Sequence, residues 1–172
     1  MASPMPDAAP AAAPPANAVA RLTVPSPVGA LTLFEHAGAI TDVLWATSDR
    51  LRNGRPTPLL AEARDQLTTY FAGRLRQFDL PLAPQGTPFR QKVWAAMRTI
   101  PYGATASYGD LALLTDSAPR AVGGACGANP IPILIPCHRV LAADGGLGGY
   151  SGGGGLATKM QLLALEGVTV SR

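Results

Sequence analysis

The sequence predicts a small α/β N-terminal domain, an antiparallel sheet with one helix, followed by a mainly α C-terminal domain. Apolar and polar residues alternate over 30–36, as they do in a half-buried strand. An apolar stripe with helical spacing runs through 59–71, and signals for further helices follow Gly86. The chain has 172 residues, of which 47% are apolar and 15% charged, so it can build a real core in one large or two small domains.

Residues 1–20 contain fourteen Ala or Pro and are expected to form a disordered tail. The tail has no basic start, and its prolines interrupt any apolar run, so it does not have the pattern of a secretory signal peptide. No apolar run approaches the ~20 residues of a membrane span, and no membrane partner is expected. Only Cys126 and Cys137 occur, which excludes a disulfide framework and favours the cytoplasm.

The small α/β domain is predicted to span residues 21–86. Strands are expected over 21–24, 30–36 and 39–46, and a helix over 59–73. Gly73 supplies the stop signal of this helix. Residues 74–86 are expected to give one more strand and then a Pro/Gly linker, which places the domain boundary near Gly86.

The C-terminal domain is predicted over residues 87–172. Helices are expected over 88–100, 108–114, 119–127 and 156–166. Thr87 and Ser107 are suitable N-caps, and Pro88 and Pro119 suit the first position of a helix. The residues expected to face inward in the last helix are Leu156, Met160, Leu163 and Ala164.

The second and third of these helices are short and joined by the turn TDSA. This arrangement is typical of a DNA-binding helix-turn-helix and also of an ordinary helical hairpin. Residues 121–128 are almost all small, although glycine weakens a helix by about 1 kcal/mol relative to alanine. A bare helix surface suits either the narrow minor groove or close packing against another helix. The whole net charge of +3 lies in residues 87–172, with seven basic and four acidic residues, which mildly favours a polyanionic partner.

The segment NPIPILIPCHRV places a thiol at the end of an apolar run whose path three prolines fix. The thiolate is the nucleophilic form of cysteine, and an adjacent base or cation lowers the thiol pKa from about 8.5. His138 and Arg139 follow Cys137 directly, and Glu166 is a candidate to orient the histidine in a nucleophile–base–acid triad. Taken alone, the Cys-His pair favours a buried structural cysteine beside a surface histidine.

No metal or cofactor is expected. Two cysteines cannot supply a four-ligand zinc site, and the two histidines lack the paired spacing of a zinc motif. The glycine-rich stretch over 145–155 lacks the Lys-Ser/Thr pattern of a P-loop. Its backbone N–H groups suit hydrogen bonding to a ligand, and the alternative is a plain flexible connector.

Four motifs in chain order resemble the O6-alkylguanine-DNA alkyltransferases: GTPFRQKVWAAMRTIPYGATASYGDLA, RAVGGACGANPIPILIPCHRV, GGYSGG and KMQLLALEG. The resemblance covers about residues 86–168 and implies an α/β domain followed by a helix-turn-helix (winged-helix-like) domain. It implies direct-reversal DNA repair, in which the protein irreversibly takes an alkyl group from O6 of guanine, and less well from O4 of thymine, onto its own cysteine. The expected protein is a monomer that binds alkylated double-stranded DNA through the minor groove, in the cytoplasm and, in a bacterium, at the nucleoid.

The resemblance assigns the chemistry to five residues. Cys137 is the expected acceptor, with His138 as its base through a bound water and Glu166 as the acid that orients the histidine. Tyr108 is expected to donate a proton or hydrogen bond to N3 of the departing guanine. Asn129 is expected to be the hinge between the helix-turn-helix and the segment that carries the cysteine.

The DNA contacts and the pocket follow from the same resemblance. The target base must leave the duplex stack, and Arg120 is expected to fill the gap that it leaves. The small residues Ala121, Gly123 and Gly124 are expected to lie along the groove floor, giving little sequence preference. The residues expected to line the substrate pocket are Pro136, Val140, Tyr150 and Ser151, with Ser151 near the O6 atom.

Three features depart from the family pattern. The turn over 115–119 is shorter than usual, extra glycines over 152–155 alter the spacing to Lys159, and an Ala/Pro tail precedes the first domain. Cys126 has no catalytic counterpart and is interpreted as a small helix residue.

Three other functions are compatible with parts of the sequence. An alkyltransferase-like lesion sensor would bind damaged DNA without repairing it, although such proteins lack the acceptor cysteine. A thiol hydrolase would turn over an ester or amide with the same three residue types. A transcription factor would need side chains that read the major groove, and the glycine-rich helix carries few of them.

Overall fold

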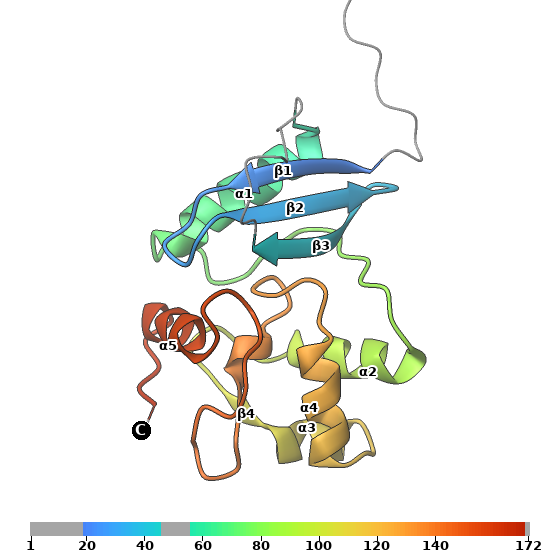
Figure 1. The fold of residues 1–172 in the computed structure, drawn as a ribbon, viewed down its shortest axis with the longest axis vertical. Coiled ribbons are helices and arrows are strands. Elements are labelled where there is room, and N and C mark those ends of the chain that lie inside the picture. The colour runs from blue at the N-terminus through green and yellow to red at the C-terminus, as the bar shows by residue number, and fades with distance from the viewer. Residues whose placement is uncertain (1–18, 46–55, 171–172) are drawn as a thin grey trace, which may run out of the picture.

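The computed structural model describes residues 19–45 and 56–170. Two parts lie one above the other in Figure 1: a three-stranded sheet backed by α1, and a group of helices beneath it. Strand β3 is the strand nearest the helical part (Figure 1). Within the described ranges, no helix is long and apolar enough to cross a membrane. The architecture confirms the predicted α/β part followed by a helical part.

The sheet consists of β1 (Ala20–Val24), β2 (Leu31–His36) and β3 (Ala39–Trp45), paired antiparallel in that order. Ala37 and Gly38 join the last two strands with φ values of 49° and 79°. A two-residue hairpin loop of this kind needs positive φ at both positions, which the glycine adopts freely. The first strand begins at Ala20 rather than Arg21, so the boundary predicted after residue 20 falls inside it. The rest of the predicted tail, residues 1–18, lies outside the described residues.

Helix α1 (Pro58–Phe71) covers one face of the sheet. Its N-cap is Thr57, whose hydroxyl accepts the Leu60 N–H at 3.1 Å, and Pro58 occupies the first position. Gly73 has a φ of 76°, the left-handed conformation that ends many helices, as the sequence predicts. The apolar residues shared between helix and sheet form the upper core: Leu22, Val24, Leu31, Leu33, Ile40, Val43, Leu60, Ala63, Leu67.

The predicted strand within 74–86 is wrong. This stretch pairs with the sheet only through an isolated bridge between Ile40 and Leu82. The Ile40 N–H donates to the Pro81 carbonyl at 2.9 Å, and the Ala83 N–H donates to the Ile40 carbonyl at 2.8 Å. Prolines at 81 and 84 remove the N–H groups that a longer ladder would need, so the pairing stops after one residue.

The C-terminal part contains α2 (Pro88–Met97), α3 (Tyr108–Leu114), α4 (Pro119–Gly127) and α5 (Leu156–Leu165), with short parallel strands β4 (Ala106–Ser107) and β5 (Val140–Leu141). Thr87 caps α2, as expected. Ser107 caps α3 in a reciprocal capping box with Asp110. The Trp94 indole donates to the Ala125 carbonyl at 2.8 Å and so ties α4 to α2. The predicted pair of short helices, α3 and α4, is confirmed.

Of the four residues predicted to face inward in α5, Leu163 is buried and the other three are not. Leu156 and Met160 are 44% and 39% exposed, and Ala164 is exposed as well. The buried residues are Thr158, Lys159, Leu162 and Leu163. Lys159 is fully buried in this helix, whereas Leu156 and Met160 are exposed. Its burial is possible because backbone carbonyls accept hydrogen bonds from its ammonium group.

Candidate active site

Residues 129–141, here called the active-site segment, follow α4 and end with β5. Asn129 closes its first turn, because its side chain donates to the Ile135 carbonyl at 2.9 Å and accepts the Ile131 N–H at 3.0 Å. Ile133 has a φ of 73°, which is a strained conformation for a β-branched residue. The contacts around the turn must therefore hold Ile133 in this strained conformation. The bond between the Asn129 side chain and the Ile131 N–H, two residues earlier, is one of these contacts.

Cys137 begins a 3₁₀ turn (η1, Cys137–Arg139) at the end of this strained turn. Its side chain is 8% exposed and borders a cavity of about 190 Å³. One wall of the cavity comes from β3, through Val43, Leu44 and Trp45. The other wall comes from the C-terminal part, through Asn129, Pro130, Pro132, Tyr150, Ser151 and Gly152. Both parts of the protein thus form the surroundings of the thiol.

Burial raises the pKa of the Cys137 thiol, while the Asn129 side chain and the Lys159 charge act in the opposite direction. The Tyr150 hydroxyl lies beside the thiol, and burial together with that neighbour raises the pKa of Tyr150. Both groups are consequently protonated at rest near neutral pH. A nucleophilic thiolate at this position needs a base that takes the proton during the reaction.

His138 is fully buried and is held by Glu166. Its Nε2 lies 2.8 Å from Glu166 Oε1, which leaves Nδ1 as the ring nitrogen without a partner among the described residues. Burial lowers the pKa of His138, although the Glu166 carboxylate partly offsets this. The imidazole is therefore neutral near pH 7 and able to accept a proton.

Glu166 is the centre of a buried hydrogen-bond network. Arg139 reaches both carboxylate oxygens, with Nε–Oε2 and Nη2–Oε1 distances of 2.9 and 2.8 Å. Tyr70 of α1 donates to Oε1 at 2.7 Å. Burial alone would raise the pKa of Glu166, but hydrogen bonds from His138, Arg139 and Tyr70 outweigh it and lower the pKa to about 2. The carboxylate stays ionised and can stabilise a positive charge on His138.

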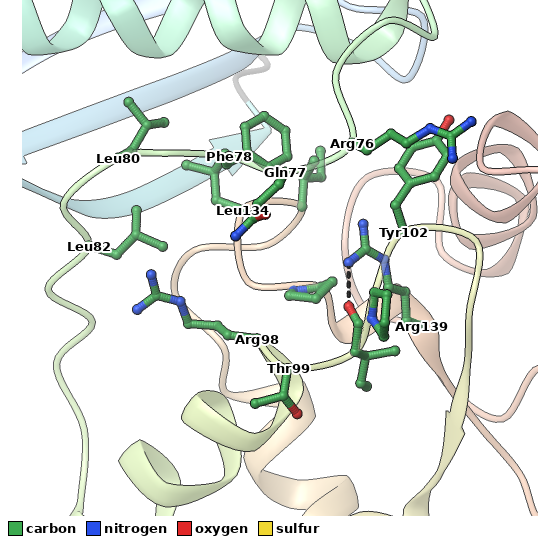
Figure 2. Close-up of a pocket in the computed structure, with 14 residues that line it drawn as sticks. Arg76, Gln77, Phe78, Leu80, Leu82, Arg98, Thr99, Tyr102, Leu134 and Arg139 are labelled. Atoms are coloured by element: carbon green, nitrogen blue, oxygen red, sulfur yellow. Dashed lines mark hydrogen bonds between the residues drawn. The ribbon is translucent and has the colours of Figure 1, made fainter.

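The back of the active-site segment borders a second cavity, of about 610 Å³, shown in Figure 2. Pro136 and Arg139 line it, together with Tyr102 and Arg98. The dashed line in Figure 2 is the bond from Arg139 Nη1 to the Ile100 carbonyl, 2.7 Å long. Arg139 therefore fixes Glu166 on one side and the chain after α2 on the other.

Lys159 holds the glycine-rich loop (145–155) against the active-site segment. Its ammonium group donates to the carbonyls of Val140 at 2.6 Å and Gly149 at 3.2 Å, and also to that of Leu147. Burial lowers the pKa of Lys159, and the carbonyl oxygens provide the acceptors that a buried ammonium requires. One side chain thus ties the first half of the loop to β5.

Tyr108, Tyr150 and Ser151 take different places around the loop. Tyr150 and Ser151, two of the residues predicted for the substrate pocket, line the cavity with Cys137. Pro136 lines the second cavity instead, and Val140 is fully buried. Tyr108 is half-buried at the start of α3, where its ring is so near Gly148 that a Cβ there would lie 2.9 Å from the hydroxyl.

Helix α4 presents a nearly bare outer surface. Arg120, Ala121 and Gly124 are exposed, whereas Val122 and Ala125 are buried. A Cβ added at Gly124 would meet nothing within 4 Å, and one at Gly123 would only touch the Tyr108 ring at 4.0 Å. Packing inside the protein therefore does not require these two glycines, contrary to the helix–helix alternative.

Comparison with known proteins places these features in one family. The family profile described as the DNA-binding domain of 6-O-methylguanine DNA methyltransferase matches residues 88–168. The profile of the ribonuclease-like domain of the same proteins matches residues 20–84. The chain belongs to the 6-O-methylguanine DNA methyltransferase family.

The Mycobacterium tuberculosis member of this family is similar to this chain along nearly its whole length. The methylated-DNA–protein-cysteine methyltransferase of Mycobacterium tuberculosis is 48% identical over 150 residues, covering 84% of this chain and 90% of the relative. The crystal structure of the M. tuberculosis O6-methylguanine methyltransferase superposes with a TM-score of 0.76, at 44% identity, covering 87% of this chain and 93% of that one. A structure of the M. tuberculosis protein in complex with DNA gives a TM-score of 0.74, at 48% identity, covering 84% and 90%.

The sequence predicted the central residues of the candidate site but not the residues that support them. The structure brings Cys137, His138 and Glu166 together, as predicted, with Asn129 clamping the turn before the cysteine. It also brings in Tyr70 and Trp45 from the N-terminal part, which carried no local signal. Of the residues that support Glu166, Arg139 was the one that lay within a recognised motif, PCHRV.

Proposed function

We propose that this protein repairs alkylated DNA by direct reversal. The Cys137 sulfur takes an alkyl group from O6 of guanine in double-stranded DNA, and less readily from O4 of thymine. The observation that carries the proposal is the position of Cys137, which borders a cavity and precedes a histidine bound to a buried, ionised glutamate. The methylated-DNA–protein-cysteine methyltransferases that the chain matches support the same reaction.

The chemistry is a displacement at the alkyl carbon. The Cys137 thiol loses its proton to the neutral His138 through a water molecule at Nδ1, and Glu166 stabilises the resulting imidazolium. The sulfur–carbon bond forms as the carbon–O6 bond breaks. Tyr108 supplies a proton or hydrogen bond at N3 of the departing guanine, which limits its negative charge. The proton that His138 took from the thiol then returns through solvent to the guanine or to Tyr108, so that the guanine and the site both end neutral. The products are an unmodified guanine and a thioether, which no group in the site can cleave, so each molecule reacts once.

The helix α4 is the proposed DNA contact. Its exposed Ala121 and Gly124, with Gly123 beside Tyr108, let the backbone approach the floor of the minor groove. Arg120 is exposed at the start of this helix, which supports a role in filling the gap left by a flipped base. We place the end of the α/β domain at Gly86 and assign the DNA-binding, active-site domain to 87–172. All of the proposed chemical groups belong to one chain, which supports action as a monomer.

Intact-mass spectrometry after mixing the protein with a duplex containing O6-methylguanine tests the proposal. We expect a gain of one methyl group per protein, located by peptide mapping on Cys137. The Cys137→Ala variant is expected to bind the same duplex without any mass change. The matched control is Cys126→Ser, since burial raises the pKa of that thiol to about 12 and its sulfur packs 3.6 Å from Met97 Sδ. It should be methylated like the wild type.

Two results would contradict the proposal. Retained lesion binding with no mass change in the wild type would indicate a lesion sensor. Absence of both binding and mass change would favour a thiol hydrolase, which turnover of ester or amide substrates would then identify.

A further inference from the structure

Trp45, at the end of β3, is held in one orientation beside the proposed alkyl-acceptor thiol. Its indole N–H donates to the Val28 carbonyl at 2.9 Å. Its ring meets Tyr150 edge-on, with centroids 6.4 Å apart and an interplanar angle of 88°. Both aromatic residues border the cavity of Cys137. The indole is therefore a fixed wall of that cavity rather than a loose surface side chain.

The strand that carries Trp45 is itself attached to the active-site segment. The Val43 N–H donates to the Pro130 carbonyl at 2.9 Å, next to the Asn129 clamp. This bond joins the two parts of the protein at the cavity. The position of Trp45 relative to Cys137 is thus set by a backbone contact.

The extra glycines of the loop are located where the indole packs. A Cβ at Gly152 would lie 2.6 Å from the Trp45 ring and 3.0 Å from the Tyr150 ring. A Cβ at Gly153 would lie 2.6 Å from the indole nitrogen. Side chains at these positions are incompatible with the present place of Trp45. The Trp45 indole therefore occupies the space that side chains at positions 152 and 153 would need.

We propose that Trp45 is a specificity-determining residue, which limits the size of the alkyl group that reaches Cys137. This inference rests on the proposed function, because it takes Cys137 as the acceptor. The cavity of about 190 Å³ is smaller than the roughly 300–1,000 Å³ of pockets for drug-sized ligands. It suits a base carrying a methyl group, and the rigid indole opposes a benzyl group at the same position.

The test compares transfer rates from O6-benzylguanine and O6-methylguanine, each placed in the same duplex sequence. Trp45→Ala is expected to raise the ratio of benzyl to methyl transfer by about tenfold or more, because even one methylene in a pocket changes selectivity by roughly 10–200-fold. The methyl rate is expected to change much less. An unchanged ratio in a variant that still transfers methyl groups would overturn the inference.

A second variant tests the inference even if Trp45→Ala destabilises the sheet. Gly152→Ala has an ordinary backbone conformation and adds one Cβ, which would lie 2.6 Å from the Trp45 ring and, less severely, 3.0 Å from the Tyr150 ring. It is expected to slow benzyl transfer more than methyl transfer, and this defect should disappear in the Trp45→Ala background. Gly154→Ala is the matched control in the same loop, since its Cβ would meet only the Thr158 hydroxyl, at 3.3 Å.

The outcomes separate this inference from the function on which it rests. A wild-type protein that transfers no alkyl group to Cys137 contradicts the proposed function. A wild-type protein that transfers methyl groups, with additive effects of Gly152→Ala and Trp45→Ala on the ratio, contradicts only the role of Trp45.

Discussion

Tyr70 of α1 donates a hydrogen bond to Glu166 at the end of α5, with the two oxygens 2.7 Å apart and the residues 96 positions apart in the chain. The same carboxylate oxygen lies 2.8 Å from His138 Nε2. The α/β part therefore contributes directly to the group that orients the proposed base. Removing Tyr70, Arg139 or His138 would leave the buried carboxylate with fewer donors, which links the stability of the fold to the chemistry of the site.

Tyr70→Phe removes this hydrogen bond and little else. We expect the free energy of unfolding to fall by about 1.5–3 kcal/mol, the range for hydrogen bonds to charged groups. Urea unfolding measures it. Tyr102→Phe is the control, because that hydroxyl donates to the neutral Leu165 carbonyl at 3.0 Å and should be worth about 1 kcal/mol. Equal losses in the two variants would argue against a special role of the Tyr70–Glu166 bond.

Glu166 also determines an acid limit of stability. Its folded-state pKa, about 2, is depressed below the ordinary value of 4.5. A carboxylate depressed in this way stabilises the fold above its unfolded pKa, and this contribution is lost as the pH falls through the folded pKa. Between pH 5 and pH 2, Glu166→Gln should therefore lose less stability than the wild type. Unfolding free energies measured across this range test the prediction, with the exposed Glu62→Gln as control.

The same Glu166→Gln variant should transfer alkyl groups slowly at neutral pH. An amide cannot stabilise the imidazolium form of His138, and a positioned acid–base group contributes about 100-fold or more to a rate. Single-turnover kinetics on an O6-methylguanine duplex measure the effect. Wild-type rates in a correctly folded Glu166→Gln protein would mean that His138 does not act as the base.

The sequence predicted the local features of this protein well, and the long-range ones poorly. The caps at Thr87 and Ser107 were predictable because a cap depends on neighbours within one turn. Tyr70 and Trp45 were not identifiable as site residues, because their partners lie far along the chain and nothing in their own segments marks them. The cysteine and its histidine were recognisable through the PCHRV motif and its context, not through the pair alone.

The orientation of α5 is a second feature that the sequence did not predict. The apolar residues Leu156 and Met160 predicted an inward face that the structure turns outward. Lys159 lies inside instead, because three backbone carbonyls of the loop and β5 accept its hydrogen bonds. Hydrophobic periodicity cannot anticipate a buried cation whose acceptors come from a separate segment.

Lys159→Met tests this buried cation. The substitution keeps an unbranched side chain but leaves the carbonyls of Val140, Leu147 and Gly149 without their donor. We expect a loss of about 3 kcal/mol or more in unfolding free energy, since each buried unsatisfied group costs roughly 1–3 kcal/mol. Exposed Lys92→Met, which also loses a bond to one carbonyl, should cost much less. If the two variants were equally stable, Lys159 would not be the tie that holds the loop.

Arg120 separates the handling of DNA from the chemistry at Cys137. Its side chain is exposed at the start of α4, and its proposed role is to fill the gap left by a flipped base. Arg120→Ala is therefore expected to slow transfer from O6-methylguanine in a duplex, whereas the reaction with the free base O6-methylguanine, which needs no flipping, should remain near the wild-type rate. Because unstacking a base costs a few kcal/mol, we expect a loss of about tenfold or more in the duplex. Single-turnover rates on the two substrates give the comparison, and equal losses on both would show that Arg120 acts on the site rather than on the DNA.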